Sequence, residues 1–481
     1  MKYNSIWKED VINTRSNSLK ENIDVDILII GGGMTGLNTA YQLKDNNEKI
    51  VLVEMNKIGE GISMRTTAKL TFLQENIYSK LSDNLSIDKA KLYYDSQKEA
   101  IKIIKDIIET NNIDCDLEKV KSYIFTEKDN EVYKVKNEEY ILSKFGCTVK
   151  NVEKLPIDVL SKYAIYVNDT YVFNPVKYMN SIKNIIKKNI KIYENTKIIE
   201  VKKFDDYYEC YTNTNIIKTK KIVFACHYPF FIKPLFIPFN TYIEKSFLLA
   251  TPVKTNKKIS IINLSNPIKS VRFYNNYMIF VSSVGMSCDK FNYYDREKEL
   301  VTFLENNKHI EYIWSNHDIM TGDSLPIIGR INNSNMFIGT GYNTWGMTNS
   351  VIASKVISDL INNKKNRYER LFNPNRGMNK LKLVSMPINM YNNLTSYVKA
   401  VFDKNSSITY KNVNGKKIGI YKENNKEYKV YTKCPHMGCS LIFNNLEKTW
   451  DCPCHGSRFD ITGKSIIGPS KYNISFDENM L

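Results

Sequence analysis

Residues 25–36 read Val-Asp-Ile-Leu-Ile-Ile-Gly-Gly-Gly-Met-Thr-Gly, and this stretch decides the fold class. The short apolar run Val25–Ile30 ends in glycines, which predicts a buried strand. A helix is expected from about Thr35 to Lys44, followed by a second strand from Lys49 to Glu54. Strand, helix and strand in this order indicate a β-α-β unit, so we expect an α/β, Rossmann-type domain.

The glycine-rich turn has the G-x-G-x-x-G spacing of a dinucleotide-binding motif, formed by Gly31, Gly33 and Gly36. The first glycine makes the tight turn, the second lets the backbone approach a pyrophosphate, and the third permits close helix–strand packing. The helix N-terminus at Met34 and Thr35 adds partial positive charge. Glu54 follows about twenty residues on, where a carboxylate bonds the adenosine ribose. The sequence therefore predicts a dinucleotide site but does not distinguish NAD from FAD.

Later segments favour FAD. Gly59–Lys69 follows Glu54 closely, and Gly322–Arg330 leads into Gly339–Thr348 and a helix. Over about residues 20–375, these segments resemble the FAD-dependent oxidoreductases of the D-amino-acid-oxidase-like class. The resemblance implies a second, mostly antiparallel sheet on the substrate side, and it implies that Lys221–Pro229 closes the FAD site. It also implies cofactor contacts from a further set of residues: Ser63, Arg65, Thr66, Gly341, Gly346, Met347 and Thr348.

Four of the nine cysteines crowd together near the C-terminus. The segment reads Cys434-Pro-His436-Met-Gly-Cys439, then Cys452-Pro-Cys454-His455-Gly-Ser457. Two thiolates and two imidazoles can bind a [2Fe–2S] cluster, and the same donors can hold a structural zinc. The spacing leaves both metals open for one set of candidate ligands: Cys434, His436, Cys452 and His455.

The surrounding residues resemble bc-complex-like Rieske domains, because Phe459-Asp460, Gly463 and Gly468-Pro469-Ser470 follow the ligand motifs. The resemblance implies a [2Fe–2S] cluster, a disulfide between Cys439 and Cys454, and a hydrogen bond from Ser457 to a cluster sulfur. Such domains often carry tyrosine where this chain has Phe459, so we expect a lower reduction potential than in those members.

Both resemblances together imply a known bacterial fusion, with Thr66–Lys69 and Asn343–Asn349 among its recurring segments. We expect an FAD-dependent oxidoreductase at 1–375, with its FAD-binding and substrate subdomains interleaved. A linker is expected at 376–404, with an amphipathic piece near Tyr391–Phe402, and a small all-β Rieske domain at 405–481.

The resemblance implies that an amine or amino acid loses a hydride to FAD from the carbon bearing nitrogen, and that the cluster then transfers electrons singly. Candidates for substrate contact are Arg272, Arg330, Tyr342 and Trp345. Arg272 can equally be a surface ion-pair residue, and Trp345 can simply pack on the flavin. No catalytic base is assigned, and His227 is expected to lie near the adenine side or to satisfy a loop.

Three other functions were weighed. A Rieske oxygenase needs a further iron held by two histidines and a carboxylate, but only three histidines lie outside the cluster motif and none are paired at helical spacing. A relay that passes electrons between two proteins without a small-molecule substrate is the alternative function. A flavoprotein with a structural zinc tail is another.

The formal net charge is +17, with lysines spread along the whole chain. Nucleic-acid binding would need a basic patch with interleaved aromatic residues, so it is not expected. An acidic electron carrier is a better partner for this charge. No apolar run reaches the roughly 18 residues of a membrane-spanning helix, and no hydrophobic segment precedes the first strand, so a cytoplasmic protein is expected.

Overall fold

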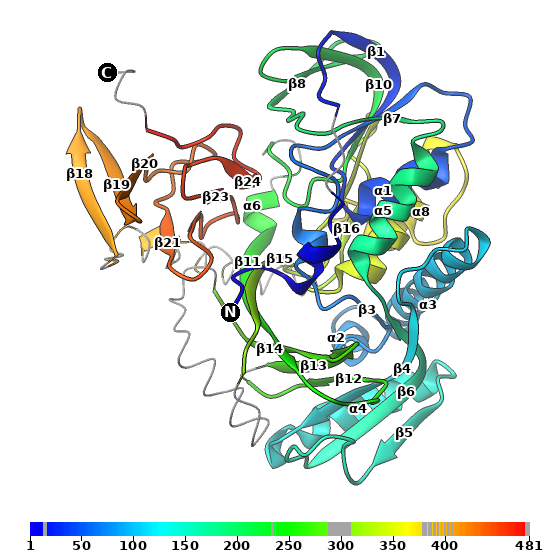
Figure 1. Cartoon of the computed structure of the whole chain (residues 1–481). Coiled ribbons are helices and arrows are strands. Elements are labelled where there is room, and N and C mark those ends of the chain that lie inside the picture. Colours follow the sequence, from blue (N-terminus) through cyan, green and yellow to red (C-terminus); the bar gives the residue numbers. More distant parts are fainter. Residues whose placement is uncertain are drawn as a thin grey trace.

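The fold is described from a computed structural model, which covers residues 1–12, 17–231, 235, 237–266, 268–286, 309–377 and 407–476, with single residues between 378 and 406. Figure 1 shows a large N-terminal domain beside a smaller C-terminal domain. We use these two names for the described residues up to 377 and for residues 407–476. Half of the predicted amphipathic piece at 391–402 falls outside the described residues.

The first sheet of the N-terminal domain has eight strands, and its central order is β16-β17-β10-β1-β2-β7. Strand β1 pairs in parallel with both β2 and β10, as the β-α-β prediction requires. The strands are β1 (Ile23–Ile30), β2 (Ile50–Val53), β7 (Lys191–Tyr193), β8 (Glu200–Lys203), β9 (Tyr208–Tyr211), β10 (Ile216–Phe224), β16 (Ile327–Arg330) and β17 (Met336–Thr340).

Three helices pack near this sheet: α1 (Met34–Leu43), α5 (Pro175–Ile186) and α8 (Gly346–Ile361). Helix α5 begins where the sequence predicts, because proline suits the first helical turn. The Asn174 side chain caps this helix by accepting from the backbone N–H groups of Val176 and Lys177. Helix α1 begins directly after the glycine turn, with Gly33 at its N-cap.

The second sheet has nine strands in the order β15-β11-β14-β13-β12-β4-β6-β3, with β5 on β6. It is antiparallel except where β12 meets β4, which confirms the expected substrate-side sheet. The strands are β3 (Lys69–Leu70), β4 (Glu118–Thr126), β5 (Val149–Val152), β6 (Tyr163–Val172), β11 (Thr241–Pro252), β12 (Ile259–Asn263), β13 (Lys269–Tyr274), β14 (Tyr277–Met286) and β15 (Tyr312–Thr321). Nearby helices are α2 (Ile77–Asn84), α3 (Ile87–Thr110) and α4 (Val132–Lys144), with α6 (Ile237–Asn240) before β11 and α9 (Glu369–Phe372) after α8.

The β11–β15 pair has two chemically different faces. Glu244 lies opposite Asp318 in the antiparallel register, and Lys245 lies opposite His317. Because successive side chains alternate across a strand, the two carboxylates share one face and Lys245 shares the other with His317. The second face meets the C-terminal domain, since Lys245 forms an ion pair with Asp451.

The C-terminal domain is all-β, as predicted. One sheet contains β18 (Ile408–Val413), β19 (Lys416–Glu423) and β20 (Lys426–Tyr431), and the other contains β21 (Ile442–Asn444), β22 (Thr449–Asp451), β23 (Arg458–Asp460) and β24 (Ser465–Ile467). Asn414 and Gly415 both have positive φ, as a tight hairpin turn between β18 and β19 requires. The small core includes the buried rings of Trp450 and Phe459.

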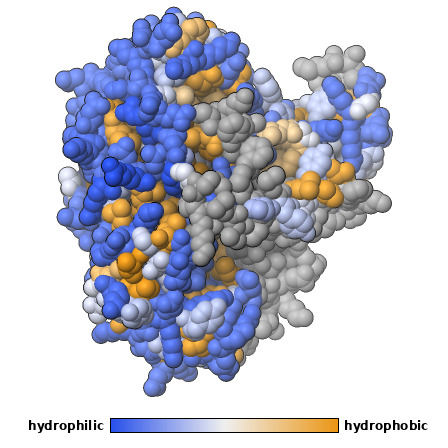
Figure 2. Space-filling view, turned by 180° about the vertical axis from the view of Figure 1, so that it is seen from behind, coloured by the Kyte–Doolittle hydropathy of each residue, from blue (hydrophilic) through white to orange (hydrophobic). Residues whose placement is uncertain are grey.

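The rear view in Figure 2 shows hydrophilic side chains over most of the described surface, with separate smaller apolar areas between them. Among the helices of the described residues, none is long and apolar enough to span a bilayer.

Candidate cofactor sites and the interface between them

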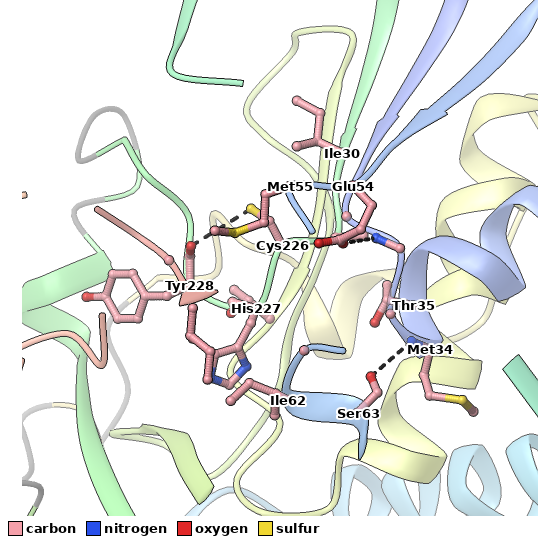
Figure 3. Close-up of a pocket in the computed structure, with 18 of the residues that line it drawn as sticks. Ile30, Met34, Thr35, Glu54, Met55, Ile62, Ser63, Cys226, His227 and Tyr228 are labelled. Atoms are coloured by element: carbon pink, nitrogen blue, oxygen red, sulfur yellow. Dashed lines mark hydrogen bonds between the residues drawn. The ribbon is translucent and has the colours of Figure 1, made fainter. Parts of the chain in front are cut away.

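A cavity runs from the glycine turn to the C-terminal domain. It encloses about 1340 Å³, including the part that opens to solvent. Figure 3 shows the strand ends and loops that surround it. Its walls come from several segments of the N-terminal domain and one loop of the C-terminal domain. The lining residues are 30–35, 53–56, 59, 61–63, 66, 196–198, 225–228, 230, 316, 318, 339, 340, 342, 344, 346, 347, 350 and 466–470.

The glycine turn exposes bare backbone because side chains do not fit there. A Cβ on Gly36 would lie 1.9 Å from the carbonyl oxygen of Gly31, and one on Gly31 would lie 2.5 Å from that of Ala225. A Cβ on Gly33 would lie 2.9 Å from the Ser63 hydroxyl, which accepts a hydrogen bond from the Met34 N–H over 3.1 Å (Figure 3). The N-terminus of α1 therefore offers backbone donors to a pyrophosphate.

Glu54 lies beside this turn and also faces the cavity (Figure 3). Its carboxylate accepts hydrogen bonds from the backbone N–H groups of Gly32 (2.7 Å) and Asn56 (2.9 Å). Burial raises the pKa of Glu54 above its ordinary value. Each carboxylate oxygen has a second lone pair, which leaves capacity to bind a ribose hydroxyl. The turn and the carboxylate together fit the adenosine diphosphate half of FAD.

Nine of the residues predicted to bind the dinucleotide line the cavity: Gly31, Gly33, Met34, Thr35, Glu54, Ser63, Thr66, Gly346 and Met347. Gly36 instead packs beneath Gly31, and neither Gly341 nor Thr348 is part of the wall. Residues that the sequence did not indicate also line it: Thr196, Lys197, Asn316, Asp318 and 466–470. Of these, only Gly468–Ser470 belong to a segment singled out in the sequence, as part of the Rieske resemblance, and no motif places any of them at this cavity, because they meet the glycine turn only through the tertiary fold.

The substrate candidates Tyr342 and Trp345, and also His227, have different surroundings. Tyr342 lines the cavity, and its hydroxyl lies 2.8 Å from the Thr35 hydroxyl. Trp345 is partly buried against the main hydrophobic core and is not among the cavity-lining residues. His227 lines the cavity, and burial lowers its pKa to about 4, so its imidazole is neutral at pH 7.

Arg272 does not occupy the predicted position for substrate contact. It is fully buried, and its Nη1 donates to the carbonyl oxygens of Thr67 (2.6 Å), Ala68 (2.9 Å) and Phe173 (3.2 Å). It is absent from the cavity wall, so it holds the chain before β3 in place instead of meeting a carboxylate. Arg330 likewise donates to backbone carbonyls.

The four predicted cluster ligands converge in the C-terminal domain. Cys434 and Cys452 are buried free thiols within hydrogen-bonding range of each other. The His436 and His455 rings are 4.9 Å apart between centroids. The sulfur atoms of Cys439, Cys452 and Cys454 also lie within 4.8 Å of one another, but a disulfide joins Cys439 to Cys454. Cys434 and Cys452 are therefore the thiols left for a metal.

The surroundings of these ligands fit an iron–sulfur cluster. Nδ1 of His436 is buried and has no hydrogen-bond partner, so a lone pair is left to bind a metal. Burial lowers the pKa of His436 to about 4 and that of His455 to about 3, which keeps both imidazoles neutral. Ser457 lies within hydrogen-bonding range of the Cys434 sulfur and accepts from the Ser470 N–H over 2.9 Å.

A buried ionic network joins the two domains. Glu447 of the C-terminal domain accepts hydrogen bonds from Arg65 (2.5 Å), the Ser315 N–H (3.0 Å) and Arg458 (2.8 Å). Asp451 accepts from Lys245 (2.8 Å) and Arg458 (2.9 Å). Arg65 was predicted to contact FAD, but it is absent from the cavity wall and instead binds the C-terminal domain.

Tyr228 connects the cavity to the cluster ligands. It follows β10, it is buried, and it lines the cavity (Figure 3). Its ring centroid lies 5.4 Å from that of His455 and 6.3 Å from that of His436. One aromatic side chain therefore separates the dinucleotide cavity from both imidazoles.

Comparison with known proteins agrees with this geometry. A family model described as FAD dependent oxidoreductase (DAO) matches residues 26–360, and one described as Rieske [2Fe-2S] domain matches residues 397–475. The Bacillus subtilis (strain 168) protein YhfW, named as a Rieske 2Fe-2S iron-sulfur protein, is 30% identical over 96% of this chain and 95% of its own length. The gamma-glutamylputrescine oxidoreductase of Escherichia coli (strain K12) is 20% identical over 74% of this chain and 88% of its own length.

The crystal structure of glycine oxidase from Geobacillus kaustophilus covers 74% of this chain and 99% of its own, with a TM-score of 0.64 and 14% identity. This likeness shows the fold alone. The family matches confirm both predicted cofactors, FAD and a Rieske [2Fe–2S] cluster, and favour iron over zinc in the C-terminal site. The chain thus belongs to the FAD-dependent oxidoreductase (DAO) family and carries a C-terminal Rieske [2Fe–2S] domain.

Proposed function

We propose that this oxidoreductase couples two-electron oxidation of an amine- or amino-acid-like substrate to one-electron transfer through its Rieske cluster. The observation that supports the coupling is the position of Tyr228, which lines the dinucleotide cavity and contacts both cluster-ligand imidazoles. When bound, FAD supplies a two-electron acceptor for a hydride, and the [2Fe–2S] cluster supplies a one-electron carrier.

Contacts between the two domains hold the dinucleotide cavity and the cluster ligands next to each other. The buried contacts of Glu447 and Asp451 reach the N-terminal domain through Arg65 and Lys245. The loop 466–470 of the C-terminal domain forms part of the cavity wall itself. Asn56, next to Glu54, donates to the carbonyl oxygen of Ile466 over 2.9 Å. These contacts favour electron transfer within this arrangement of the two domains over a mechanism in which the Rieske domain moves between distant positions.

The substrate class is supported by the Escherichia coli relative, whose name refers to gamma-glutamylputrescine. The mechanism also needs an external partner that accepts electrons from the Rieske cluster. The net charge of +17 favours an acidic electron carrier, because complementary charge accelerates association.

The test is the anaerobic transfer of electrons from FAD to the cluster in the holoprotein. Light-driven reduction of FAD should be followed by a rhombic Rieske EPR signal and by partial reoxidation of the flavin, because one cluster accepts one of its two electrons. Full recovery of the oxidised flavin absorbance should need an added external one-electron acceptor. In Tyr228→Leu the transfer rate should fall, whereas Tyr228→Phe keeps the ring and should retain most of the rate. A cluster that stays oxidised beside reduced FAD in the unaltered protein would refute the coupling.

A further inference from the structure

The cavity-facing side of the β11–β15 pair carries unpaired acidic groups. Asp318 lines the cavity, and Glu244 lies opposite it in the strand register. Directly opposed residues have Cβ atoms about 5 Å apart, so the two carboxylates are neighbours. Glu75, from the segment before α2, lies near enough to Glu244 for the Glu244 charge to raise its pKa. Asp318 therefore lies in the cavity wall with two further carboxyl groups nearby.

These carboxylates lack a matching positive charge. Among the described residues, none of the three forms an ion pair with a basic side chain, although Lys80 acts on Glu75 and Glu244, and Lys69 acts on Glu75, from farther away. Burial, reinforced by the Glu244 charge, raises the pKa of Asp318 to about 7 and that of Glu75 to about 7. The Tyr242 hydroxyl donates to Glu244 over 3.1 Å, but it carries no charge.

Asn316 gives an independent indication of a ligand. It lines the same cavity and is 7% exposed. Its amide Nδ2 donates to Asp318 over 3.1 Å, whereas its Oδ1 is buried without any hydrogen-bond partner. An unpaired buried carbonyl oxygen is costly, and a donor from a ligand would satisfy it. The wall at this point thus offers an unpaired carbonyl oxygen beside the carboxyl group of Asp318.

Apart from the backbone donors at the glycine turn, the described wall of this cavity offers little to an anionic group. Arg272 lies outside the wall; its Nη1 donates to backbone carbonyls and its Nη2 is buried without a hydrogen-bond partner. Among the described residues that line the cavity, Lys197 is the one lysine or arginine, and burial lowers its pKa to about 8. Its Nζ donates to Ser465 of the C-terminal domain over 3.1 Å. A carboxylate beside Asp318 and Glu244 would meet like charges without compensation.

We propose that the substrate is a cationic amine without a carboxylate on its amine-bearing carbon, and that Asp318, Glu244 and the Oδ1 of Asn316 bind its ammonium group. This inference rests on the proposed oxidase-type function and narrows its substrate class to amines. The site binds amines more tightly than amino acids, because the carboxylate of an amino acid is repelled by Asp318 and Glu244.

The experiment compares matched pairs that differ by one carboxylate: 1,4-diaminobutane with ornithine, and 1-aminobutane with 2-aminopentanoate. Binding to the anaerobic holoprotein is followed by perturbation of the flavin spectrum, and reduction by loss of its absorbance. Each amine should bind at least tenfold more tightly than its carboxylated partner. In Asp318→Asn and Glu244→Gln, amine affinity should fall about tenfold to a hundredfold, the range for hydrogen bonds to charged groups. Glu118→Gln, on β4 of the same sheet, should leave it unchanged.

The outcomes separate this inference from the proposed function. Amines that bind but leave FAD oxidised would support the cationic site and count against the oxidation. Amino acids that bind as tightly as the amines and reduce FAD would overturn the cationic site while the oxidation stands. Failure of either amine to perturb the flavin, or unchanged amine binding in both carboxylate variants with normal flavin content, would also overturn it.

Discussion

Replacement of Glu447 by glutamine should weaken the attachment of the Rieske domain by about 3–5 kcal/mol, the usual cost of breaking a buried ion pair. The Glu447 side chain is 4% exposed and its partner Arg458 is 0% exposed, so solvent cannot replace the lost charge. In the variant, Arg65 and Arg458 face a neutral amide in place of a carboxylate. The other hydrogen bond that the structure shows for the Arg65 guanidinium is to the Ser315 carbonyl oxygen. The side-chain volume stays almost unchanged.

The charge state at neutral pH follows from the pKa of Glu447. Burial alone would raise this pKa, but Arg458 and Arg65 outweigh burial and lower it to about 2. A carboxylate with a depressed folded-state pKa stabilises the protein above its unfolded value of about 4.5, and the contribution is lost as the pH falls toward 2. The full effect of Glu447→Gln is therefore expected at pH 7.

The assay is urea denaturation at pH 7, with visible circular dichroism for the cluster and fluorescence for the flavin. Separate chromophores are needed because two domains need not unfold in one step. The cluster transition of Glu447→Gln should shift to lower urea. The control is Glu427→Gln, whose partner Lys422 lies 2.8 Å away at the surface and whose loss should cost about 0–1 kcal/mol. If the free energy of unfolding measured at the cluster differs by less than 1 kcal/mol between Glu447→Gln and the unaltered protein, the network does not hold the domains together.

Three further outcomes are expected. Gly36→Ala should abolish FAD binding, because its Cβ would lie 1.9 Å from the Gly31 oxygen, whereas Gly377→Ala meets nothing within 4 Å and should bind FAD normally; flavin content after purification measures both. Cys434→Ser should lose the Rieske EPR signal and keep the flavin absorbance, and persistence of the signal would exclude this thiol as a ligand. Burial raises the pKa of Glu138 from 4.5 to about 7, so its contribution to stability is present below pH 4.5 and is lost as the pH rises through 7. Glu138→Gln should therefore flatten the fall in stability between pH 5 and pH 8 by roughly 3 kcal/mol, as denaturant titrations at the two pH values would show.

Both cofactor motifs could be predicted from the sequence because each lies within a short segment. The turn Gly31–Gly36 needs small residues at set spacings, and the first strand and helix around it follow from apolar periodicity. The thiols and imidazoles of the cluster likewise come from two short loops, at Cys434–Cys439 and Cys452–Ser457.

The roles of the arginines and the position of the domain interface were decided by the tertiary structure. Arg65 meets Glu447 across 382 positions of the chain, and Arg272 meets the carbonyl of Thr67 across 205. An arginine has the same donors whether it binds a substrate carboxylate, a glutamate or a carbonyl. Only the folded packing determines which acceptor is within reach and shielded from water. Local spacing thus indicated a dinucleotide site and a metal site, and the resemblance of the surrounding segments to known families identified the cofactors. Long-range contacts determined how the two sites meet at Tyr228.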